Sequence, residues 1–381
     1  MKKLFSLFIL VSMFICFFSP VLFSQTVTED PFNENVNFEE GTLKAEVLEV
    51  ETKEFEEGRM KYNQNLRIEI ISNQYEGEIM EIENNIMRNS IYGEKLLEAG
   101  DRILLAAFYE NGELVDLQFQ DLLRERGLIY LGLLTLLLLL IIARKQGVRT
   151  IIALLLTMGI IFFYLIPQIA EGAAPIQTAV LTSLVLIVII QGIIGGFKIK
   201  SLAAIIGTAA GVICAGALAY IFGQLVELSG LSSEEARLLI GSELDFDPKG
   251  ILFAGIIIGS LGAVTDVAMS IASVAESTWQ NSRDLSIAKL YKIGLQVGRD
   301  IIGTMSNTLI LAYAGSSLSL FILFYHFSDG WIELVNMDLV ATEIIRGLAG
   351  TVGLIITIPI TAFTAAVLYH KFDSQKNINK N

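Results

Sequence analysis

Asp266 lies in the middle of a stretch of glycine, alanine, serine and alkyl residues, GSLGAVTDVAMSIASVAES, at positions 259–277. An ionisable carboxylate in such surroundings can bind a proton or a cation. At about 100° per residue on a helix, one face groups this aspartate with small and polar residues: Gly255, Gly259, Gly262, Ser270, Ser273 and Ser277. The spacing predicts one narrow polar face along an otherwise alkyl-rich helix.

Two interpretations of this face compete. Gly255 and Gly259 form a G-x-x-x-G pair and Gly262 continues it, a pattern typical of close helix packing, in which serines also hydrogen-bond across the interface. Asp266 favours a functional use, because a carboxylate in a membrane-spanning helix costs about 2.5–3.5 kcal/mol on insertion scales. We therefore expect Asp266 to face protein or water.

A second polar cluster occurs in GRDIIGTMSNTLILAYAGSS at positions 298–317, where Asp300, Thr304 and Asn307 share a helical face. Helix capping by Asp300 and an interhelical hydrogen bond from Asn307 are the structural alternative. If the two carboxylates lie in one cavity, the two helices supply an ion or substrate path. Its candidate residues are Asp266, Ser270, Ser273, Asp300, Thr304 and Asn307.

The composition of the chain that positions these residues indicates a polytopic membrane protein. The chain has 381 residues, of which 53% are hydrophobic and only 18% charged, against about 25% charged in soluble domains. Several apolar runs exceed the 18 residues needed to cross a bilayer. We predict about seven spans after the N-terminus, at 127–143, 150–167, 174–196, 201–226, 250–277, 303–325 and 347–369.

The basic residues orient this helical domain, residues 127–369. Twelve of them fall in the loops and tail predicted to be cytoplasmic, and three, Arg237, Lys249 and Arg346, in the predicted outside loops. The positive-inside rule then places the protein in the cell membrane with the C-terminal tail, 370–381, in the cytoplasm. One predicted cytoplasmic segment, 284–302, reads as a basic amphipathic helix, either an interfacial connector or a regulatory element.

The N-terminal part of the chain differs in composition. Residues 1–24 carry two lysines and a long apolar stretch, the pattern of a signal peptide, cleaved near Ser24 or retained as an anchor. Residues 25–126 hold 24 of the 40 acidic and 10 of the 27 basic residues, which indicates a separate extracytoplasmic domain. Period-two alternation predicts five short strands there, at 42–50, 65–71, 77–83, 101–109 and 113–119. They predict an all-β barrel of OB-like or SH3-like type, acting as a cap or as a ligand-binding module.

Other chemistries find little support. The two cysteines, Cys16 and Cys214, allow neither a disulfide framework nor C-x-x-C metal spacing. No P-loop pattern is present, and no dense basic patch with interleaved aromatic residues points to nucleic acid. We expect no cofactor, no metal site and no nucleic-acid partner.

The two polar stretches also carry a family resemblance. GAVTDVAMSIASVAES, GRDIIGTMSNTLILAYAGSS and GLAGTVGLIITIPITA (347–362) resemble the YibE/F-like family of bacterial membrane proteins. QNLRIEIISNQYEGEIMEIEN (64–84) and GDRILL (100–105) are similar to the extracytoplasmic domain of its longer, YibE-type members. The resemblance implies a multi-pass protein of a family described as permeases without an established substrate. It also implies a YibF-type partner as an alternative to a homo-oligomer, and it supplies no catalytic residues.

We therefore expect a permease or channel for a small solute or ion, with Asp266 at its centre and no enzymatic activity. One alternative is a receptor or scaffold that acts through the extracytoplasmic domain. Another is an intramembrane hydrolase in which Asp266 and Asp300 share a proton.

Overall fold

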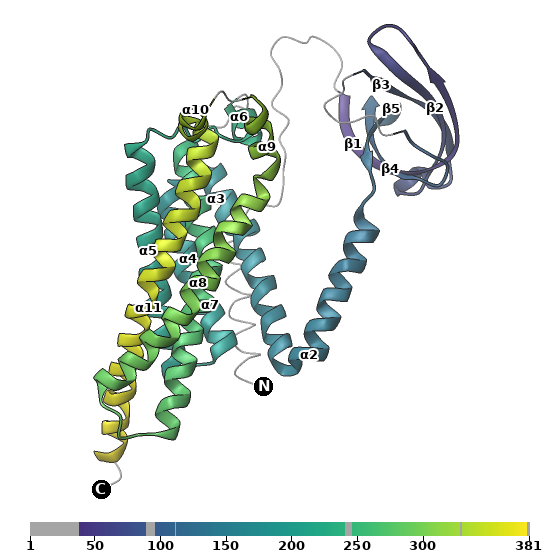
Figure 1. The fold of residues 1–381 in the computed structure, drawn as a ribbon. Helices are drawn as coiled ribbons and strands as arrows, with labels where there is room; N and C mark the ends of the chain where they lie inside the picture. The colour runs from purple at the N-terminus through teal and green to yellow at the C-terminus, as the bar shows by residue number, and fades with distance from the viewer. Residues whose placement is uncertain (1–37, 89–95, 111, 241–245, 328–329, 379–381) are drawn as a thin grey trace. The chain divides into compact units, whose positions relative to one another are not determined.

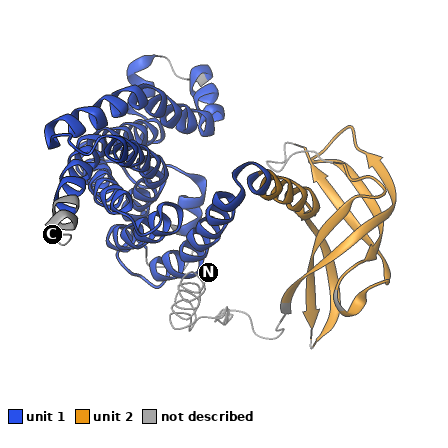
Figure 2. Cartoon of the chain, turned by 90° about the horizontal axis from the view of Figure 1, so that it is seen from below, with its two compact units in different colours: residues 1–22, 139–381 blue, residues 23–138 orange. Residues whose placement is uncertain are grey.

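The computed structural model describes residues 38–88, 96–110, 112–240, 246–327 and 330–378. They fall into two compact units that divide between Leu138 and Leu139 (Figure 2). The first unit contains a β-sheet and the start of a helix, and the second is helical (Figure 1). The predicted signal segment, residues 1–24, lies outside the described residues.

The first unit is built on five strands, and the five predicted strands are confirmed. A 3-10 turn, η1 (Asn73–Tyr75), connects the second and third. The strands are β1 (Phe38–Glu54), β2 (Met60–Ile70), β3 (Ile79–Met87), β4 (Arg102–Glu110) and β5 (Glu113–Leu122). The sheet order is β3-β2-β1-β4-β5, and every neighbouring pair is antiparallel. β3 and β5 are therefore the two edge strands and run in the same direction.

Alternating side chains create the core of this sheet. On β2, Leu66, Ile68 and Ile70 are fully buried, whereas Asn65 and Arg67 between them are exposed. Leu43 and Leu105 join them from β1 and β4. One curved face of the sheet thus encloses an apolar interior, the arrangement of a partly open five-stranded barrel.

A buried amide ties a connecting segment to this interior. Gln64 is 1% exposed, and its Nε2 donates to the carbonyl oxygen of Leu97 at 3.0 Å, while its Oε1 accepts from the Leu97 amide at 3.0 Å. The same Oε1 accepts from Nδ2 of Asn84 at 3.1 Å. The chain before β4 is therefore fixed to β2 and β3 by side-chain hydrogen bonds.

The sheet continues into the first helix through a short connector. β5 ends at Leu122, and α2 (Glu125–Ile160) begins three residues later. Lys44 Nζ donates to Glu125 Oε2 at 2.6 Å, and Arg102 Nη1 lies 4.0 Å from Glu125 Oε1. The first turn of α2 is thereby ion-paired to both β1 and β4.

The second unit consists of the rest of α2 and the helices that follow. A π-helical turn, η2 (Ile161–Leu165), follows α2 directly. The remaining helices are α3 (Ile166–Ala170), α4 (Pro175–Gly195), α5 (Ile199–Leu225), α6 (Glu234–Ile240), α7 (Pro248–Asn281), α8 (Ile287–Ser316), α9 (Leu318–Phe327), α10 (Trp331–Asn336) and α11 (Asp338–Ile378).

Five helical stretches of the described residues are long and apolar enough to cross a membrane, or six if the pair α8 and α9, bent by 63°, counts as one span. The prediction of seven spans is not confirmed. The difference lies in the stretch Glu125–Ala170, whose 46 residues contain the first two predicted spans. A straight helix of that length would measure about 69 Å, more than twice the hydrocarbon core, but Arg144 within it is non-helical, with φ 48° and ψ −120°.

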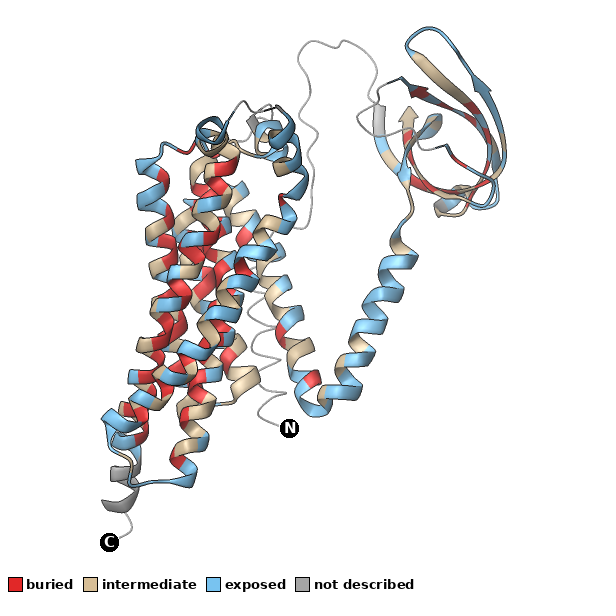
Figure 3. Ribbon diagram, viewed as in Figure 1, coloured by how far each residue is buried: buried red, intermediate tan, exposed pale blue. Residues whose placement is uncertain are grey.

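α7 is the central helix of the bundle and packs against α4, α5, α8 and α11. The buried residues of the bundle gather where these helices face one another (Figure 3). α5 and α11 approach closely because glycines face threonines across their contact: a Cβ on Gly211 would collide with Thr357 Oγ1, and one on Gly207 with Thr361 Oγ1. Small residues thus permit the tight helix packing that membrane bundles use.

The segment predicted as a separate amphipathic helix, 284–302, is instead the start of α8, which runs without a break from Ile287 to Ser316. Its N-terminus is capped by Ser286, whose Oγ accepts from the Lys289 amide at 3.3 Å. Gly294 and Gly298 on this half face Ala362 and Ile358 of α11. Packing against α11 therefore extends the helix beyond the boundary expected from hydropathy.

Candidate intramembrane polar site

The polar face predicted on α7 exists, and it lies on the surface of the bundle. Gly255, Gly259, Gly262, Asp266 and Ser270 are all exposed, and Ser273 is half-buried. Between them, apolar neighbours such as Ile256, Val264 and Val267 are fully buried. α7 therefore turns its apolar side to the other helices and its polar face away from them.

Two of the three glycines on this face meet no neighbour within the described chain, and the third faces α8. A Cβ added to Gly255 or Gly262 would meet nothing within 4 Å, and at Gly259 it would lie 3.0 Å from Tyr313 Oη of α8. Close packing occurs instead at glycines of α5, α8 and α11. Gly255 and Gly262 thus leave an open surface beside Asp266, whereas Gly259 faces α8.

The carboxylate of Asp266 has no hydrogen-bond or ion-pair partner among the side chains that the structure describes. The backbone oxygen of Asp266 accepts from Ser270 Oγ at 2.8 Å, and Ser277 Oγ donates to Ser273 O at 3.0 Å. The serine hydroxyls therefore bond to their own helix, while the acid stays available for a proton, a cation or a partner chain.

Two charged clusters indicate the depth of Asp266. Near Gly259, Tyr313 lies under Arg346, whose guanidinium carbon is 5.9 Å from the ring centre and whose Nη1 is 2.7 Å from Glu343 Oε1. Toward the other end of α7, Glu276 Oε2 is 2.8 Å from Lys200 Nζ. Seventeen residues separate positions 259 and 276, about 26 Å along a helix, close to the thickness of the hydrocarbon core. Asp266 lies between the two clusters along α7.

These clusters were not predicted as pairs. The side chain of Glu276 is only 15% exposed and is held by Lys200 from the start of α5. Helical periodicity along one segment cannot reveal a partner on another segment, so such pairs require the tertiary packing.

The predicted polar face of α8 also points away from the other helices of the bundle. Asp300, Thr304 and Asn307 are exposed, while Gly294 and Gly298 on the opposite side are buried against α11. Thr304 Oγ1 donates to the Ile301 carbonyl oxygen at 3.0 Å, again within its own helix.

α7 and α8 pack against each other, but no hydrogen bond or ion pair among the described residues joins Asp266 or Ser270 to Asp300, Thr304 or Asn307. The two rows therefore lie on the exposed faces of neighbouring helices. The sequence predicts one cavity that contains both Asp266 and Asp300. The described helices alone do not enclose such a cavity.

The interior of the bundle also holds polar groups that lack partners. Gln191 of α4 is fully buried, and neither its amide nitrogen nor its oxygen has a hydrogen-bond partner in the described structure. The hydroxyls of Thr208 and Thr361 are in the same condition. Across the described residues, no group of three or more His, Cys, Asp or Glu side chains is placed to hold a metal ion.

Comparison with known proteins places the chain in a family. The family described as YibE/F-like protein matches residues 131–371, and the family described as YibE/F family N-terminal domain matches residues 38–122. Neither the curated proteins nor the solved structures contain a match to the chain. The first match covers the helices that carry the polar site and the second covers the sheet. The chain belongs to the YibE/F-like family of membrane proteins and includes the N-terminal domain of that family.

Proposed function

We propose that the helical bundle is a permease or channel for a small ion or solute, with Asp266 as its central binding group. The observation that carries this proposal is the unpartnered carboxylate on a small-residue face at mid-depth of α7. A carboxylate in contact with lipid costs about 2.5–3.5 kcal/mol on insertion scales. Water, a bound cation or another polypeptide must therefore cover it in the membrane.

The ligand chemistry of the two faces favours a proton or a small hard cation. Asp266 and Asp300 supply carboxylate oxygens, and Asn307 supplies an amide oxygen. Oxygen ligands of this kind suit hard cations, and a single intramembrane carboxylate suits a proton relay. Thr304, Ser270 and Ser273 line the path rather than bind strongly, since the hydroxyls of Thr304 and Ser270 donate to their own helices.

A second wall completes the path in this proposal. The open surface at Gly255 and Gly262 admits the close approach of another helix, which a second copy of the chain or a YibF-type membrane protein would provide.

The proposed topology in the bilayer of the cell membrane has seven spans, with Arg144 at the turn between the first two. The sheet lies outside and the C-terminus lies in the cytoplasm.

Ion flux tests the proposal directly. Purified chain is reconstituted into liposomes that contain a dye selective for the ion under test, and proton, sodium and potassium gradients are imposed in turn. Asp266→Asn should reduce the flux at least tenfold, whereas Asp284→Asn, an exposed acid in the loop between α7 and α8, should leave it unchanged. Flux that is equal in wild type and Asp266→Asn would refute the proposal.

A non-enzymatic role fits the same geometry better than a hydrolytic one. A carboxylate dyad needs two groups about 3 Å apart that share a proton. Asp266 and Asp300 lie on separate helices and are joined by no hydrogen bond in the described structure. Full function in each single Asp→Asn variant would exclude the dyad outright.

A receptor or scaffold role is the second candidate, because the sheet of the N-terminal domain has two free edges. Deletion of residues 25–126 separates the two candidates. If the chain is a permease, the flux measured in liposomes persists after this deletion. If the chain is a receptor or scaffold, the deletion abolishes its cellular effect and leaves any flux through the bundle unchanged.

A further inference from the structure

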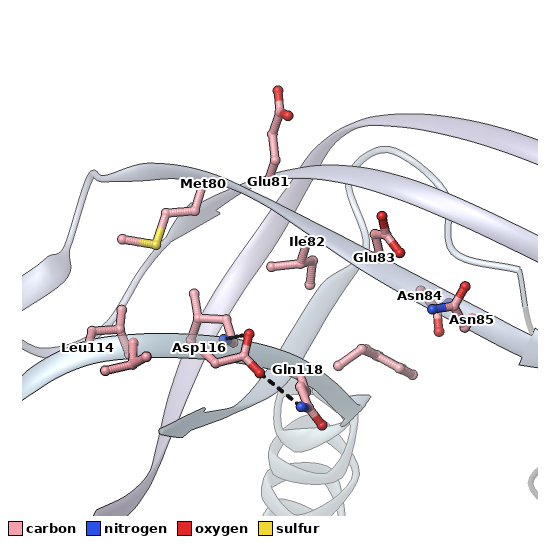
Figure 4. Close-up of a pocket in the computed structure, with 12 residues that line it drawn as sticks. Met80, Glu81, Ile82, Glu83, Asn84, Asn85, Leu114, Asp116 and Gln118 are labelled. Carbon is pink, nitrogen blue, oxygen red and sulfur yellow. Dashed lines mark hydrogen bonds between the residues drawn. The ribbon is translucent and has the colours of Figure 1, made fainter. Parts of the chain in front are cut away.

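The two edge strands of the sheet border a groove with a volume of about 760 Å³ (Figure 4). It is lined by residues 80–85 of β3 and 114–119 of β5. In the described structure each of these strands has a hydrogen-bonded neighbour on one side only, β2 for β3 and β4 for β5. β3 and β5 contact each other over part of their length without pairing, so the groove follows an incompletely closed seam of the barrel.

Side chains of opposite character alternate along the groove. Ile82, Leu117 and Phe119 turn toward the core of the domain, and Leu117 and Phe119 are only partly buried. Glu81 and Glu83 alternate with Ile82 on β3 and are exposed. Figure 4 shows Glu81 pointing away from the opening and Ile82 pointing into it. The floor of the groove thus combines these apolar side chains with the buried amide of Asn84, between acidic rims.

The side chain of Asp116 on β5 accepts a hydrogen bond from a backbone amide of its own strand. Asp116 Oδ1 accepts from the Leu117 amide at 2.9 Å, and its Oδ2 accepts from Gln118 Nε2 at 2.9 Å (Figure 4). A carboxylate here satisfies an edge amide that a partner strand would otherwise satisfy with a carbonyl oxygen. Charged groups on edge strands also prevent the pairing of identical sheets.

We propose that this groove binds an extended segment of another protein, in which apolar residues alternate with lysine or arginine, by strand addition to the free edge of β3 beside β5. Main-chain hydrogen bonds to the edge of β3 supply affinity, and the alternate side chains supply specificity. The apolar residues enter the groove toward Leu117 and Phe119, and the basic residues meet Glu81, Glu83 and Asp116. Six groove residues on each edge span about 20 Å, so the segment is six or seven residues long.

Charge selects this occupant over the two others that the chain itself offers. The residues before β1, 25–37, include Glu29, Asp30 and Glu34 and no basic residue. A second copy would bring the same excess of acidic residues, 24 against 10 basic between positions 25 and 126. Like charges on both sides of the groove oppose pairing, whereas a basic segment neutralises the rims.

Peptide binding to the full chain tests the proposal. The chain is held in zwitterionic nanodiscs, with empty discs as background, and a fluorescein-labelled KVKVKVKV peptide is titrated by fluorescence anisotropy. A peptide of the same composition without alternation, VVVVKKKK, and the acidic EVEVEVEV should each bind at least tenfold more weakly. Two further versions of KVKVKVKV carry N-methyl groups on every second backbone amide, one on the odd-numbered and one on the even-numbered residues. One of these two peptides should bind at least tenfold more weakly than the unmethylated peptide.

Charge reversal locates the site. Glu81→Lys combined with Glu83→Lys should weaken KVKVKVKV at least tenfold, and Glu56→Lys combined with Glu57→Lys, two exposed acids in the β1–β2 turn, should change it less than threefold. Equal losses in both variants, or equal binding of the alternating and block peptides, would show attraction to net charge alone and overturn the proposal.

Photocrosslinking identifies the occupant. A benzoylphenylalanine in place of Val115, which is 55% exposed beside the groove, should capture the peptide, and one in place of Phe55, 41% exposed at the end of the domain, should not. Capture of a second copy at position 115, or of residues 25–37 of the same chain, would overturn the assignment to a foreign basic segment.

Discussion

Glycines on neighbouring helices of this bundle occupy opposite environments. Gly211 of α5 faces Thr357 Oγ1 and lies so near α11 that its Cβ would be 2.8 Å from the Gly353 carbonyl oxygen. Gly262 of α7 faces open space. The first glycine is required by the fold of the single chain, whereas the second is available for a contact outside it.

Alanine at these two positions should therefore act oppositely. Gly211→Ala forces α5 away from α11, and such overpacking should lower the free energy of unfolding by about 1–3 kcal/mol. Gly262→Ala adds a helix-favouring methyl without a clash and should leave that free energy unchanged or raise it by up to about 1 kcal/mol. Thermal unfolding in detergent, followed by the fluorescence of Trp279 and Trp331, measures both. Equal destabilisation by the two variants would contradict the packing described.

The buried amide of Gln64 gives a second prediction for a single residue. Gln64→Leu leaves the Leu97 amide and its carbonyl without their partner, and each unsatisfied buried group costs about 1–3 kcal/mol. We expect at least tenfold faster hydrogen exchange at Leu97, measured by mass spectrometry on the full chain. Asn63→Ala, which removes only the exposed 2.7 Å bond to Asn85, is the control and should leave that exchange rate unchanged.

At the scale of elements, the interruption of α2 depends on one unusual residue. Arg144 adopts φ 48° and ψ −120°, a conformation that glycine accepts readily and other residues adopt only with strain. Arg149, five residues later in the same helix, has helical backbone angles and is not strained in this way. Replacement by glycine therefore separates backbone strain from the loss of a basic side chain.

Arg144→Gly should raise the free energy of unfolding by about 1 kcal/mol because it removes the left-handed strain. Arg149→Gly should lower it by about 1 kcal/mol, since glycine is unfavourable inside a helix. Both variants lose one exposed positive charge, so a difference in melting temperature in detergent reports the backbone alone. A destabilising Arg144→Gly would mean that the arginine side chain, rather than the backbone, holds the turn.

At the scale of the whole molecule, the proposed orientation can be measured by labelling. In a background with Cys16→Ser and Cys214→Ser, Glu234→Cys on α6 and Ser282→Cys after α7 lie at opposite ends of the bundle helices, and both positions are exposed. A membrane-impermeant maleimide should label the first in intact cells and the second only after permeabilisation. The reverse pattern would invert the orientation derived from the basic residues.

Local periodicity predicted most elements of this molecule. The five strands follow from alternation such as Leu66, Ile68 and Ile70, and the helices α4, α5 and α7 follow from apolar runs ended by glycine or charged residues. The polar faces of α7 and α8 also follow from spacing alone, because a face is a property of one helix. Sequence could not predict that both faces point out of the bundle.

What could not be predicted depends on contacts between segments. The packing of Gly294 and Gly298 on α11 decides that α8 is continuous through residue 302. The strain at Arg144 and the pairing of Glu276 with Lys200 depend on where distant parts of the chain meet. Gly255 and Gly262 match the pattern of packing glycines, yet no described neighbour reaches them.

The connector between β5 and α2 couples the edge of the sheet to the first helix. Only Leu123 and Arg124 separate the strand from the helix, and Glu125 is fastened to Lys44 and Arg102 on two further strands. Such a joint has little slack. A displacement of β5 would therefore be passed directly to the first turn of α2.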